Sequence, residues 1–225
     1  MAHSTPGPPD CELILPCLDE GPALRELLPR VPRGLGVIVV DNGSRDDTAA
    51  VARSHGAKVV TEPRRGYGAA VHAGLEAATA PYVVVMDGDG SLDPGEIVPL
   101  LARVRFGEAD LALGRRVPVR RGIWPWHARL GNALVLALLR RRLGVRVRDI
   151  GPLRAARRES LLGLEVADRG MGYPVELLDR AAQAGWRIVE QDVRYLPRAA
   201  GTRSKVSGSV RGTVRAARDF WRVLA

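Results

Sequence analysis

The segment of residues 82–94, YVVVMDGDGSLDP, constrains the fold more than any other part of the chain. Its three successive valines, residues 83–85, predict a strand that is buried on both faces, which is typical of a parallel sheet covered by helices. Asp87 and Asp89 follow this strand directly. Ligands of such sheets bind in the crevice beyond the carboxyl ends of the strands, so we expect both carboxylates at a ligand site.

Two carboxylates in this position suit a divalent cation that keeps several waters and takes its other oxygens from substrate phosphates. The plainer alternative is a turn, for which the sequence DGDG is well suited. A turn alone does not explain two acids and Ser91 after such an apolar strand. We therefore favour metal and phosphate binding.

The N-terminal half of the chain alternates apolar strands with helical segments. Repetition at this spacing is typical of right-handed parallel crossovers, so we predict a doubly wound α/β sheet. Ser44, with Asp47 three residues later, resembles a helix N-cap, and Gly56 is placed to end that helix. Strands are predicted at residues 11–15, 36–40, 58–61, from residue 82 and near residue 111, and further helices at residues 22–30 and 95–106 and up to residue 78.

The strand and helix pattern changes after Gly114. A basic loop that contains proline leads to an apolar run at residues 130–143, which ends in arginines. A helix is predicted from Pro174, with Gly185 as its end, and residues 186–196 alternate like a strand. The second half is therefore expected to complete the same α/β unit with different elements.

The formal net charge is +9, and the basic excess lies after Arg103. Lys58 and Lys205 are lysines, and the other cations are arginines, which bind phosphate in a fork geometry. A biased genome is an alternative source of the arginines. The asymmetry indicates an anionic partner for the C-terminal half: nucleic acid, a membrane surface or a phosphorylated substrate.

A nucleic-acid-binding module is the weakest of these alternatives. Aromatic residues are not interleaved with the basic ones, no RNA-binding motif is present, and the acidic crevice would have no role. The two cysteines, Cys11 and Cys17, show no disulfide or zinc pattern, which fits a reducing compartment. The N-terminal residues lack the pattern of a secretory signal, so a cytoplasmic location is expected.

Acidic side chains follow two further predicted strands, in the loops PCLDEG after Leu15 and DNGS after Val40. Because these ends meet at one edge of a parallel sheet, the acids are expected to converge on the same crevice as Asp87. Asp41 can accept hydrogen bonds from a nucleobase or a ribose, or it can be a turn acid. Glu20 can do similar work, or it can simply occupy the first turn of its helix.

The segment RRGYGAAVHAG, residues 64–74, places arginines and glycines before a helix. Backbone N–H groups at a helix N-terminus suit phosphate. A dinucleotide-binding fingerprint would require glycine at Val71 and would normally follow the first strand, so we reject a nicotinamide or flavin oxidoreductase. Neither lysine lies in a Walker sequence, which also excludes a P-loop nucleotidase.

These blocks, in their order along the chain, resemble glycosyltransferase family 2, and most closely its polyprenyl-phosphate (dolichol-phosphate) sugar transferases. The likeness extends over nearly the whole chain from Cys11 to Gly208, in a short form without transmembrane helices. Any single block is weakly specific, whereas the ordered set is specific for the family. The blocks are LPCLDE, VVDNGSRDDT, EPRRGYGAAVHAG, VVMDGDGSLDP, GRR, RLGN, RDIGPLRA, GYPVELL and PRAAGTRSKVSG.

The resemblance implies a GT-A type fold, with a mostly parallel central sheet flanked by helices, and transfer of a hexose from a GDP- or UDP-sugar. It implies that Asp87 and Asp89 form a DxD pair that holds Mg²⁺ or Mn²⁺, with Ser91 where related enzymes often carry glutamine. The implied donor-binding residues are Pro16, Glu20, Asp41, Gly66, Gly68 and Asp87. The implied contacts to an acceptor phosphate are Arg115, Arg129, Arg198 and Lys205, of which Arg198 and Lys205 are also catalytic candidates together with Asp89.

An inverting single displacement follows if the acceptor oxygen attacks the anomeric carbon in line, while metal and basic groups stabilise the leaving diphosphate. The leading acceptor is a polyprenyl phosphate, whose oxygen is already anionic. The alternative is a small soluble molecule, either phosphorylated or with a hydroxyl. A hydroxyl acceptor requires a base, for which Asp149 is the candidate by position. Asp149 can equally pair with an arginine.

One domain is predicted at residues 11–225, after a flexible N-terminus at residues 1–10, because no repeat or low-complexity linker divides the chain. It comprises a nucleotide-sugar-binding half at residues 11–113, an acceptor half at residues 114–206 and a basic amphipathic helix at residues 207–225.

The segment of residues 123–142 combines two tryptophans with leucines and arginines. This composition suits a helix in the interface of an anionic membrane. Its apolar run is far shorter than the roughly 20 residues that a membrane span needs. The alternatives are a partly buried helix over the active site and a contact between protomers, so an oligomer is possible.

Overall fold

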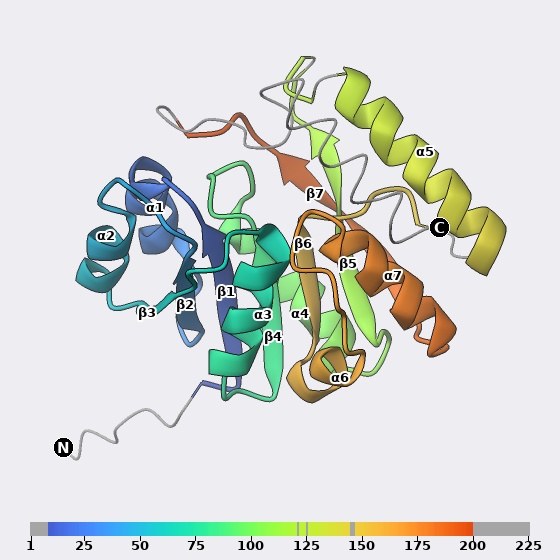
Figure 1. Ribbon diagram of the computed structural model, residues 1–225, viewed down its shortest axis with the longest axis horizontal. Helices are drawn as coiled ribbons and strands as arrows, with labels where there is room; N and C mark the ends of the chain where they lie inside the picture. Colours follow the sequence, from blue (N-terminus) through green and yellow to red (C-terminus); the bar gives the residue numbers. More distant parts are fainter. Residues whose placement is uncertain (1–8, 121, 125, 145–146, 200–225) are drawn as a thin grey trace.

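The computed structural model describes residues 9–120, 122–124, 126–144 and 147–199 (Figure 1). The predicted C-terminal helix at residues 207–225, Lys205 and most of the predicted N-terminal segment lie outside the described residues. Within them, the chain forms one seven-stranded sheet with the strand order β3-β2-β1-β4-β6-β5-β7. The strands are β1 (Cys11–Cys17), β2 (Gly36–Asp41), β3 (Lys58–Thr61), β4 (Tyr82–Met86), β5 (Leu111–Pro118), β6 (Leu153–Arg157) and β7 (Ile188–Tyr195).

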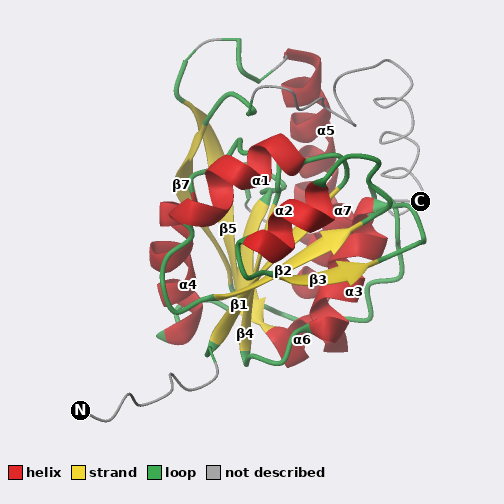
Figure 2. Ribbon diagram, turned by 90° about the vertical axis from the view of Figure 1, so that its left-hand side faces the viewer, coloured by secondary structure: helices red, strands yellow, loops and turns green. Residues whose placement is uncertain are grey.

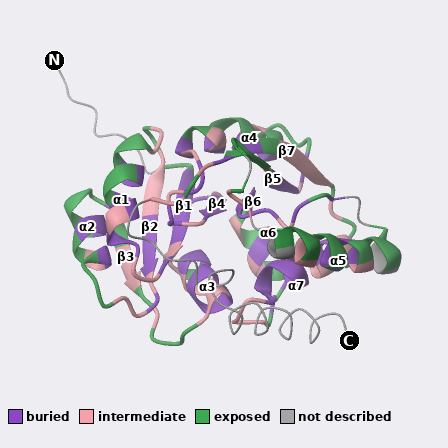
Figure 3. Cartoon of the chain, turned by 90° about the horizontal axis from the view of Figure 1, so that it is seen from above, coloured by how far each residue is buried: buried purple, intermediate pink, exposed green. Residues whose placement is uncertain are grey.

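Helices cover both faces of the sheet, as the view in Figure 3 shows. One face packs against α1, α2 and α4, and the other against α3, α5, α6 and α7. The described helices are α1 (Gly21–Leu27), α2 (Thr48–Ser54), α3 (Tyr67–Ala77), α4 (Ile97–Arg105), α5 (Trp126–Leu143), α6 (Arg158–Gly163) and α7 (Tyr173–Gln183), with 3₁₀ turns η1 (Leu28–Arg30) and η2 (Pro94–Glu96).

The valine-rich strand β4 is buried on both faces, as its sequence predicts. Val83 and Val85 pack into the core on the side of α3 and α7, and Val84 packs into the core on the side of α1 and α4. Side chains of a strand alternate between the two faces, so an uninterrupted apolar run fills both layers at once. The predicted doubly wound, mostly parallel α/β fold is confirmed.

The strand order reverses direction between β1 and β4, which run parallel to each other. From β1 the chain adds β2 and β3 on one side, and β4 then lies on the other side. This reversal is the place where open α/β sheets bind ligands, in the crevice beyond the carboxyl ends of the strands. The segment that follows Met86, with Asp87 and Asp89, therefore lies at the position where such sheets bind ligands.

Strand β6 runs antiparallel to both of its neighbours, β4 and β5. Its first residue, Leu153, pairs with Met86, so Asp149 and Gly151, which precede it, lie at the rim where β4 ends. The sequence LRAAR did not predict this strand, because alanine and arginine have little preference for strands. The strand forms since burial between β4 and β5 outweighs local preference.

The helix predicted to be capped by Ser44 begins four residues later, at Thr48. The Ser44 hydroxyl instead accepts a hydrogen bond from the backbone N–H of Asp19 at 2.9 Å. The backbone N–H of Ser44 donates to Asp41 Oδ1 at 2.8 Å. The predicted cap is wrong because the polar side chains of this segment connect two loops rather than cap a helix.

Helix α5 lies at the end of the molecule where β5 and β7 finish, as Figures 1 and 2 show. Val135, Leu136 and Leu139 anchor it in the core next to α7. Of the helices in the described ranges, none is both long enough and apolar enough to cross a bilayer.

Candidate active site at the carboxyl ends of the strands

Asp89 lies in the loop after β4 with an exposed fraction of 8%. Its Oδ1 accepts a hydrogen bond from the backbone N–H of Ser91 at 2.9 Å. Its Oδ2 forms an ion pair with Arg198, a residue more than one hundred positions later in the chain. The loop therefore delivers this carboxylate in a defined orientation, next to a cation from the segment that follows β7.

Asp87 is half-buried at the rim, but its Oδ1 is shielded from solvent and has no hydrogen-bond partner among the described residues. Burial and the neighbouring charge of Asp89 raise the pKa of Asp87 to about 6, against the opposing effect of Arg154, Arg116 and Arg198. An acidic oxygen that is buried without a donor is costly unless a cation or a bound ligand compensates it. Asp87 thus has the chemistry of a metal ligand.

The described residues contain no group of three or more His, Cys, Asp or Glu side chains that could hold a metal ion. Two carboxylates nevertheless fit Mg²⁺ or Mn²⁺, since such ions often take their remaining oxygens from water and substrate phosphates. Gly88 lies between the two acids, and a Cβ at this position would come within 2.5 Å of Cys17 Sγ. The DGD sequence is therefore packed tightly against the end of β1.

Arg198 belongs to a segment that runs along the loop of Asp89. Leu196 donates its backbone N–H to the carbonyl of Ser91 at 2.9 Å, and Ala199 donates to the carbonyl of Asp89 at 3.1 Å. Burial opposes the charge of Arg198, but the carboxylate of Asp89 outweighs it and raises the pKa of the guanidinium. The structure thus brings Arg198 to Asp89, while Lys205 lies outside the described residues, and the catalytic roles of these residues stay predictions.

Arg116, rather than the predicted Arg115, is the arginine of β5 that turns toward the other acids. Its guanidinium bonds both carboxylate oxygens of Asp149, through Nε at 2.8 Å and Nη2 at 2.6 Å. Arg115 pairs with Asp192 at 2.5 Å, in a largely exposed position. Neighbouring residues of a strand point to opposite faces, so only one of the two arginines can lie on this side.

Asp149 is 1% exposed and is engaged by Arg116 on both oxygens. Its backbone N–H donates to Glu190 Oε1 at 2.9 Å. This geometry favours the structural alternative, in which Asp149 pairs with an arginine. A role as general base would require Arg116 to leave first.

A pocket of about 310 Å³ adjoins Arg116 at the end of β5. Trp124 forms one wall, and the guanidinium carbon of Arg116 lies 4.1 Å from the centroid of the Trp124 ring. Arg129, predicted to contact an acceptor phosphate, lines the same pocket, whereas Arg115 does not appear in its lining. The lining residues are Arg116, Pro118, Arg120, Gly122, Trp124 and Arg129.

The predicted donor-binding residues of β1 and β2 lie side by side, because Pro16 pairs with Val40 and Cys17 with Asp41 in the parallel register. Asp41 Oδ1 holds its own turn through Ser44, which is the plainer of the two roles considered for it. Glu20 is 7% exposed and lies at the N-cap of α1, directly before the first turn that its plainer alternative predicted. Their contacts to a nucleotide stay predictions.

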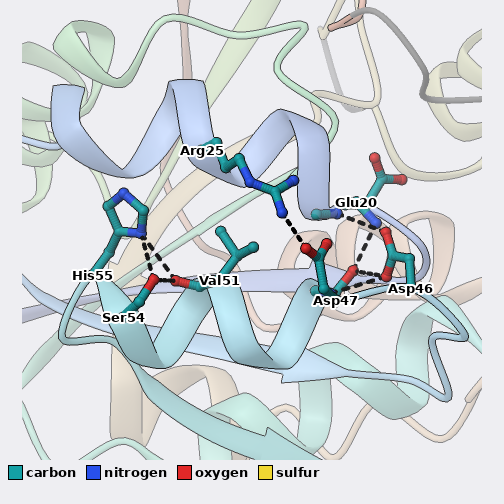
Figure 4. A network of polar contacts seen from close by, with 9 residues as sticks. Glu20, Arg25, Asp46, Asp47, Val51, Ser54 and His55 are labelled. Atoms are coloured by element: carbon teal, nitrogen blue, oxygen red, sulfur yellow. Dashed lines mark hydrogen bonds and ion pairs between the residues drawn. The ribbon is translucent and has the colours of Figure 1, made fainter.

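Two aspartates connect these loops, as Figure 4 shows: Asp46, which sequence reasoning did not single out, and Asp47, which it considered only as part of a helix cap. Asp46 Oδ2 accepts the backbone N–H of Gly21 at 2.9 Å, and its Oδ1 accepts that of Thr48 at 3.0 Å. Asp47 pairs with Arg25 of α1. These contacts join the start of α1 to the start of α2 and stabilise the rim on the side of β1 and β2.

The N-terminus of α3 does not offer the phosphate site that its glycines suggested. The backbone N–H of Gly68 donates to the carbonyl of Gly170 at 3.0 Å, and that of Ala69 to the carbonyl of Arg169 at 2.9 Å. The N–H of Gly66 donates to Asn42 Oδ1 at 2.8 Å. These N–H groups already donate hydrogen bonds within the protein. Any contact of Gly66 and Gly68 with a nucleotide sugar therefore has to use other atoms.

Close packing explains both glycines instead. Gly66 has φ +149°, and a Cβ there would lie 2.0 Å from the carbonyl oxygen of Arg169. A Cβ on Gly68 would lie 2.5 Å from the carbonyl oxygen of Asp168. Glycine permits such a close approach of two backbones, which a side chain would prevent.

Sequence reasoning missed Arg116 and Arg154, and it considered Trp124 only as part of the helix predicted at residues 123–142. A signal was present for Arg116, since it is in the same block as Arg115 and only the strand register separates the two. Arg154 is 4% exposed in the unpredicted strand β6. Without that strand, its place beside β4 could not be found.

Fold and site together define a glycosyltransferase of the GT-A class, with acidic residues after β4 at the ligand crevice and arginines around it. Residues 12–163 match the family described as Glycosyl transferase family 2, and the chain belongs to this family. The predicted hexosyltransferase activity and the GT-A fold are thereby confirmed.

Relatives extend along nearly the whole chain. An uncharacterized glycosyltransferase of Mycobacterium tuberculosis is 55% identical over 213 residues, which are 95% of this chain and 97% of the relative. Polyprenol monophosphomannose synthase of Mycolicibacterium smegmatis is 34% identical over 221 residues, covering 88% of this chain and 81% of the relative.

A solved structure shares the fold. Glucosyl-3-phosphoglycerate synthase of Mycobacterium tuberculosis, crystallised with Mn²⁺, UDP and phosphoglyceric acid, is 26% identical with a TM-score of 0.74. The similarity covers 97% of this chain and 78% of that chain. Divalent metal use in this family is supported by such complexes.

Proposed function

We propose that this protein is a metal-dependent, inverting glycosyltransferase that moves a sugar from a GDP- or UDP-sugar to a polyprenyl phosphate. The proposal is carried by the proximity of two features, the acidic loop after β4 and an arginine-lined pocket. The carboxylates of Asp87 and Asp89 lie at the switch point of the sheet, and the arginine-lined pocket of Arg116, Arg120 and Arg129 lies at the end of β5.

On the donor side, Asp87 and Asp89 would hold Mg²⁺ or Mn²⁺. Such an ion, when bound, neutralises charge that develops on the leaving diphosphate. Asp89 is oriented for this role by the N–H of Ser91. Arg198 supplies a second positive charge at the same carboxylate and can transfer its hydrogen bonds to a phosphate oxygen.

On the acceptor side, three arginines line one pocket, which suits a dianionic phosphate monoester. The oxygen of such an acceptor is already ionised near neutral pH and needs no strong base for attack. This agrees with the state of Asp149, whose oxygens are both bonded to Arg116. The arginines orient the acceptor oxygen for in-line attack on the anomeric carbon.

The neighbour crystallised with phosphoglyceric acid supports a second candidate, in which the acceptor is a small soluble phosphorylated molecule. The donor chemistry and the arginine pocket would be the same. The names of the polyprenyl-phosphate relatives favour the lipid acceptor.

A panel of UDP-, GDP- and dTDP-sugars with Mn²⁺ tests the proposal, using labelled sugar and either polyprenyl phosphate in detergent or 3-phosphoglycerate as acceptor. We expect transfer of label into the lipid phase, dependent on the metal. Transfer to 3-phosphoglycerate without transfer to lipid would support the second candidate instead. Binding of none of the donors would refute both.

Peripheral attachment to an anionic membrane forms part of the proposal. Trp126, Leu130 and Leu134 are 75%, 52% and 59% exposed on α5. Their spacing of four residues places them on one face of the helix. Arg129 belongs to the same helix, so the apolar face adjoins the acceptor pocket.

Flotation with vesicles that contain phosphatidylglycerol tests this attachment. Leu134→Asp is expected to reduce binding severalfold at low salt, because it places a charge on the apolar face. Val98→Asp is the matched control, since Val98 is 50% exposed on α4. Equal flotation of both variants and the unaltered protein would contradict the assignment of this face.

A further inference from the structure

Arg154 is a buried cation to which the proposed reaction assigns no role. It is 4% exposed and lies in β6, where it pairs in register with Val85 of β4. Its Nε is buried and has no hydrogen-bond partner among the described residues. Asp87 Oδ1, just beyond the end of β4, is in the same condition.

Tyr67 holds the guanidinium of Arg154. The Nη1 of Arg154 donates a hydrogen bond to the Tyr67 hydroxyl at 3.0 Å, and the guanidinium carbon lies 5.8 Å from the centroid of the tyrosine ring. Burial raises the pKa of the Tyr67 hydroxyl, so this group stays neutral and accepts the bond. Tyr67 is the first residue of α3, whose N-terminus is itself bonded to residues 169 and 170.

The two other arginines that favour the charge of Asp87, Arg116 and Arg198, differ from Arg154 in their hydrogen bonds. Arg116 bonds Asp149 directly, and Arg198 bonds Asp89 directly. Arg154 pairs with Val85 on the neighbouring strand, two residues before Asp87, and its charge favours the ionised form of Asp87. Yet no hydrogen bond joins these two residues in the described part of the chain, although both retain unsatisfied atoms.

A direct hydrogen bond between Arg154 and Asp87 would occupy the carboxylate oxygen that a metal ion requires. Compensation of the charge without a hydrogen bond has the opposite effect, because it stabilises a buried carboxylate and leaves its oxygen unpaired. The bond to Tyr67 supplies the restraint that separates the guanidinium from the carboxylate.

We propose that Arg154, held by Tyr67, is a positioning residue of the cation site: it compensates Asp87 through space, and Tyr67 prevents it from pairing with the free Asp87 oxygen. The inference rests on the proposed function, since it presupposes that Asp87 serves a bound cation. It adds a pair of residues from α3 and β6 that set the affinity for this cation without touching it.

The test is the affinity for Mn²⁺, measured at pH 8 by electron paramagnetic resonance of the free ion, with and without UDP. In Tyr67→Phe, Arg154 loses its partner and turns to Asp87, so we expect about tenfold weaker Mn²⁺ binding, the size of one hydrogen bond to a charged group. Tyr82→Phe is the control, because it removes a tyrosine hydroxyl at the opposite end of β4, where Tyr82 pairs with Arg157.

The double variant Tyr67→Phe with Arg154→Met is expected to recover most of the lost affinity, because the competing cation is gone. Wild-type affinity in Tyr67→Phe, or a double variant as weak as Tyr67→Phe, would overturn the inference. A metal-free crystal structure of Tyr67→Phe gives an independent result: Arg154 bonded to Asp87 supports the inference, and an unmoved guanidinium overturns it. If the unaltered protein binds no Mn²⁺ in either condition, the proposed function fails and the inference with it.

Discussion

The two halves of the rim stabilise their carboxylates in different ways. On the side of β1 and β2, backbone N–H groups bond Asp41, which accepts from Ser44, and Asp46, which accepts from Gly21, while the half-exposed Asp47 pairs with Arg25. On the side of β5 and β7, arginine side chains bond Asp149 and Asp89, in the pairs Arg116–Asp149 and Arg198–Asp89, and Asp89 also accepts the backbone N–H of Ser91.

This difference has a consequence for binding. A carboxylate bonded to backbone groups of its own loops can move only if the loops move, so the first side is preformed. An arginine can exchange a carboxylate for a phosphate oxygen by rotating its side chain, because both present the same bidentate acceptor. The second side is therefore built to respond to an anionic substrate.

Asp89→Ala is expected to have the largest effect on this arrangement. It removes one proposed metal ligand and the partner of Arg198, so metal-dependent turnover should fall by about a hundredfold or more. Turnover at saturating Mn²⁺ is the measurement, and an unchanged circular dichroism spectrum establishes that the fold is intact. Undiminished turnover would refute the metal role of Asp89.

Arg116→Met tests whether the arginine side of the rim carries stability as well as binding. The change leaves Asp149 buried without its partner, so the free energy of unfolding should fall by about 3 kcal/mol. Urea denaturation measures it. Adding Asp149→Asn should restore part of the loss, and a double variant no more stable than Arg116→Met would show that the pair is not the cause.

Gly66→Ala tests the preformed side. A Cβ at this position meets the Arg169 carbonyl oxygen, and the backbone has φ +149°, so we expect a loss of about 2 kcal/mol in unfolding free energy. Gly131→Ala is the matched control, because no atom lies within 4 Å of its added Cβ and it lies in α5. Equal stability of the two variants would contradict the packing explanation.

Glu176→Gln should have the smallest effect, and a pH-dependent one. Burial opposes the charge of Glu176, but the N–H groups of Ala167 and Asp168 and the guanidinium of Arg180 outweigh it and hold the pKa of Glu176 below its ordinary value. A lowered folded pKa contributes stability above the unfolded pKa, and this contribution is lost as pH falls through the folded pKa. Glu176→Gln should thus cost about 1 kcal/mol at pH 7 and little in strong acid.

Thermal melts of both proteins from pH 7 downward provide the measurement. A constant difference between them at all pH values would mean that the charge of Glu176 is not responsible. Glu176 also matters for the rim, because its carboxylate accepts the N–H groups of Ala167 and Asp168. The next two residues, 169 and 170, bond the N-terminus of α3.

Much of the fold could be predicted because its signals are local. The triple valine of β4, the alternation of strands and helices and the glycine after α7 each report a strand, a crossover or a helix end without reference to the rest of the chain. Strand β6 could not be predicted, since its residues have no preference for strands and only the gap between β4 and β5 selects them.

The residues of the candidate site differ in the same way: some are indicated by the local sequence, and others only by tertiary contacts. Asp87 and Asp89 could be found because they follow a recognisable strand, and parallel strands end at one edge. Arg116 could not be separated from Arg115, because the distinction depends on which face of β5 is turned toward Asp149. Gly66 and Gly68 were recognised as special, but the reason lay in a segment a hundred residues later.

The sequence by itself determined the class of fold, the family and the acidic loop after β4, since each is encoded in contiguous residues whose pattern has a direct physical meaning. Only the tertiary structure decided which arginine pairs with, or lies near, which carboxylate. Arg198, Arg116 and Arg154 come from three separate elements, and their distances from the carboxylates follow from strand register and packing rather than from order along the chain.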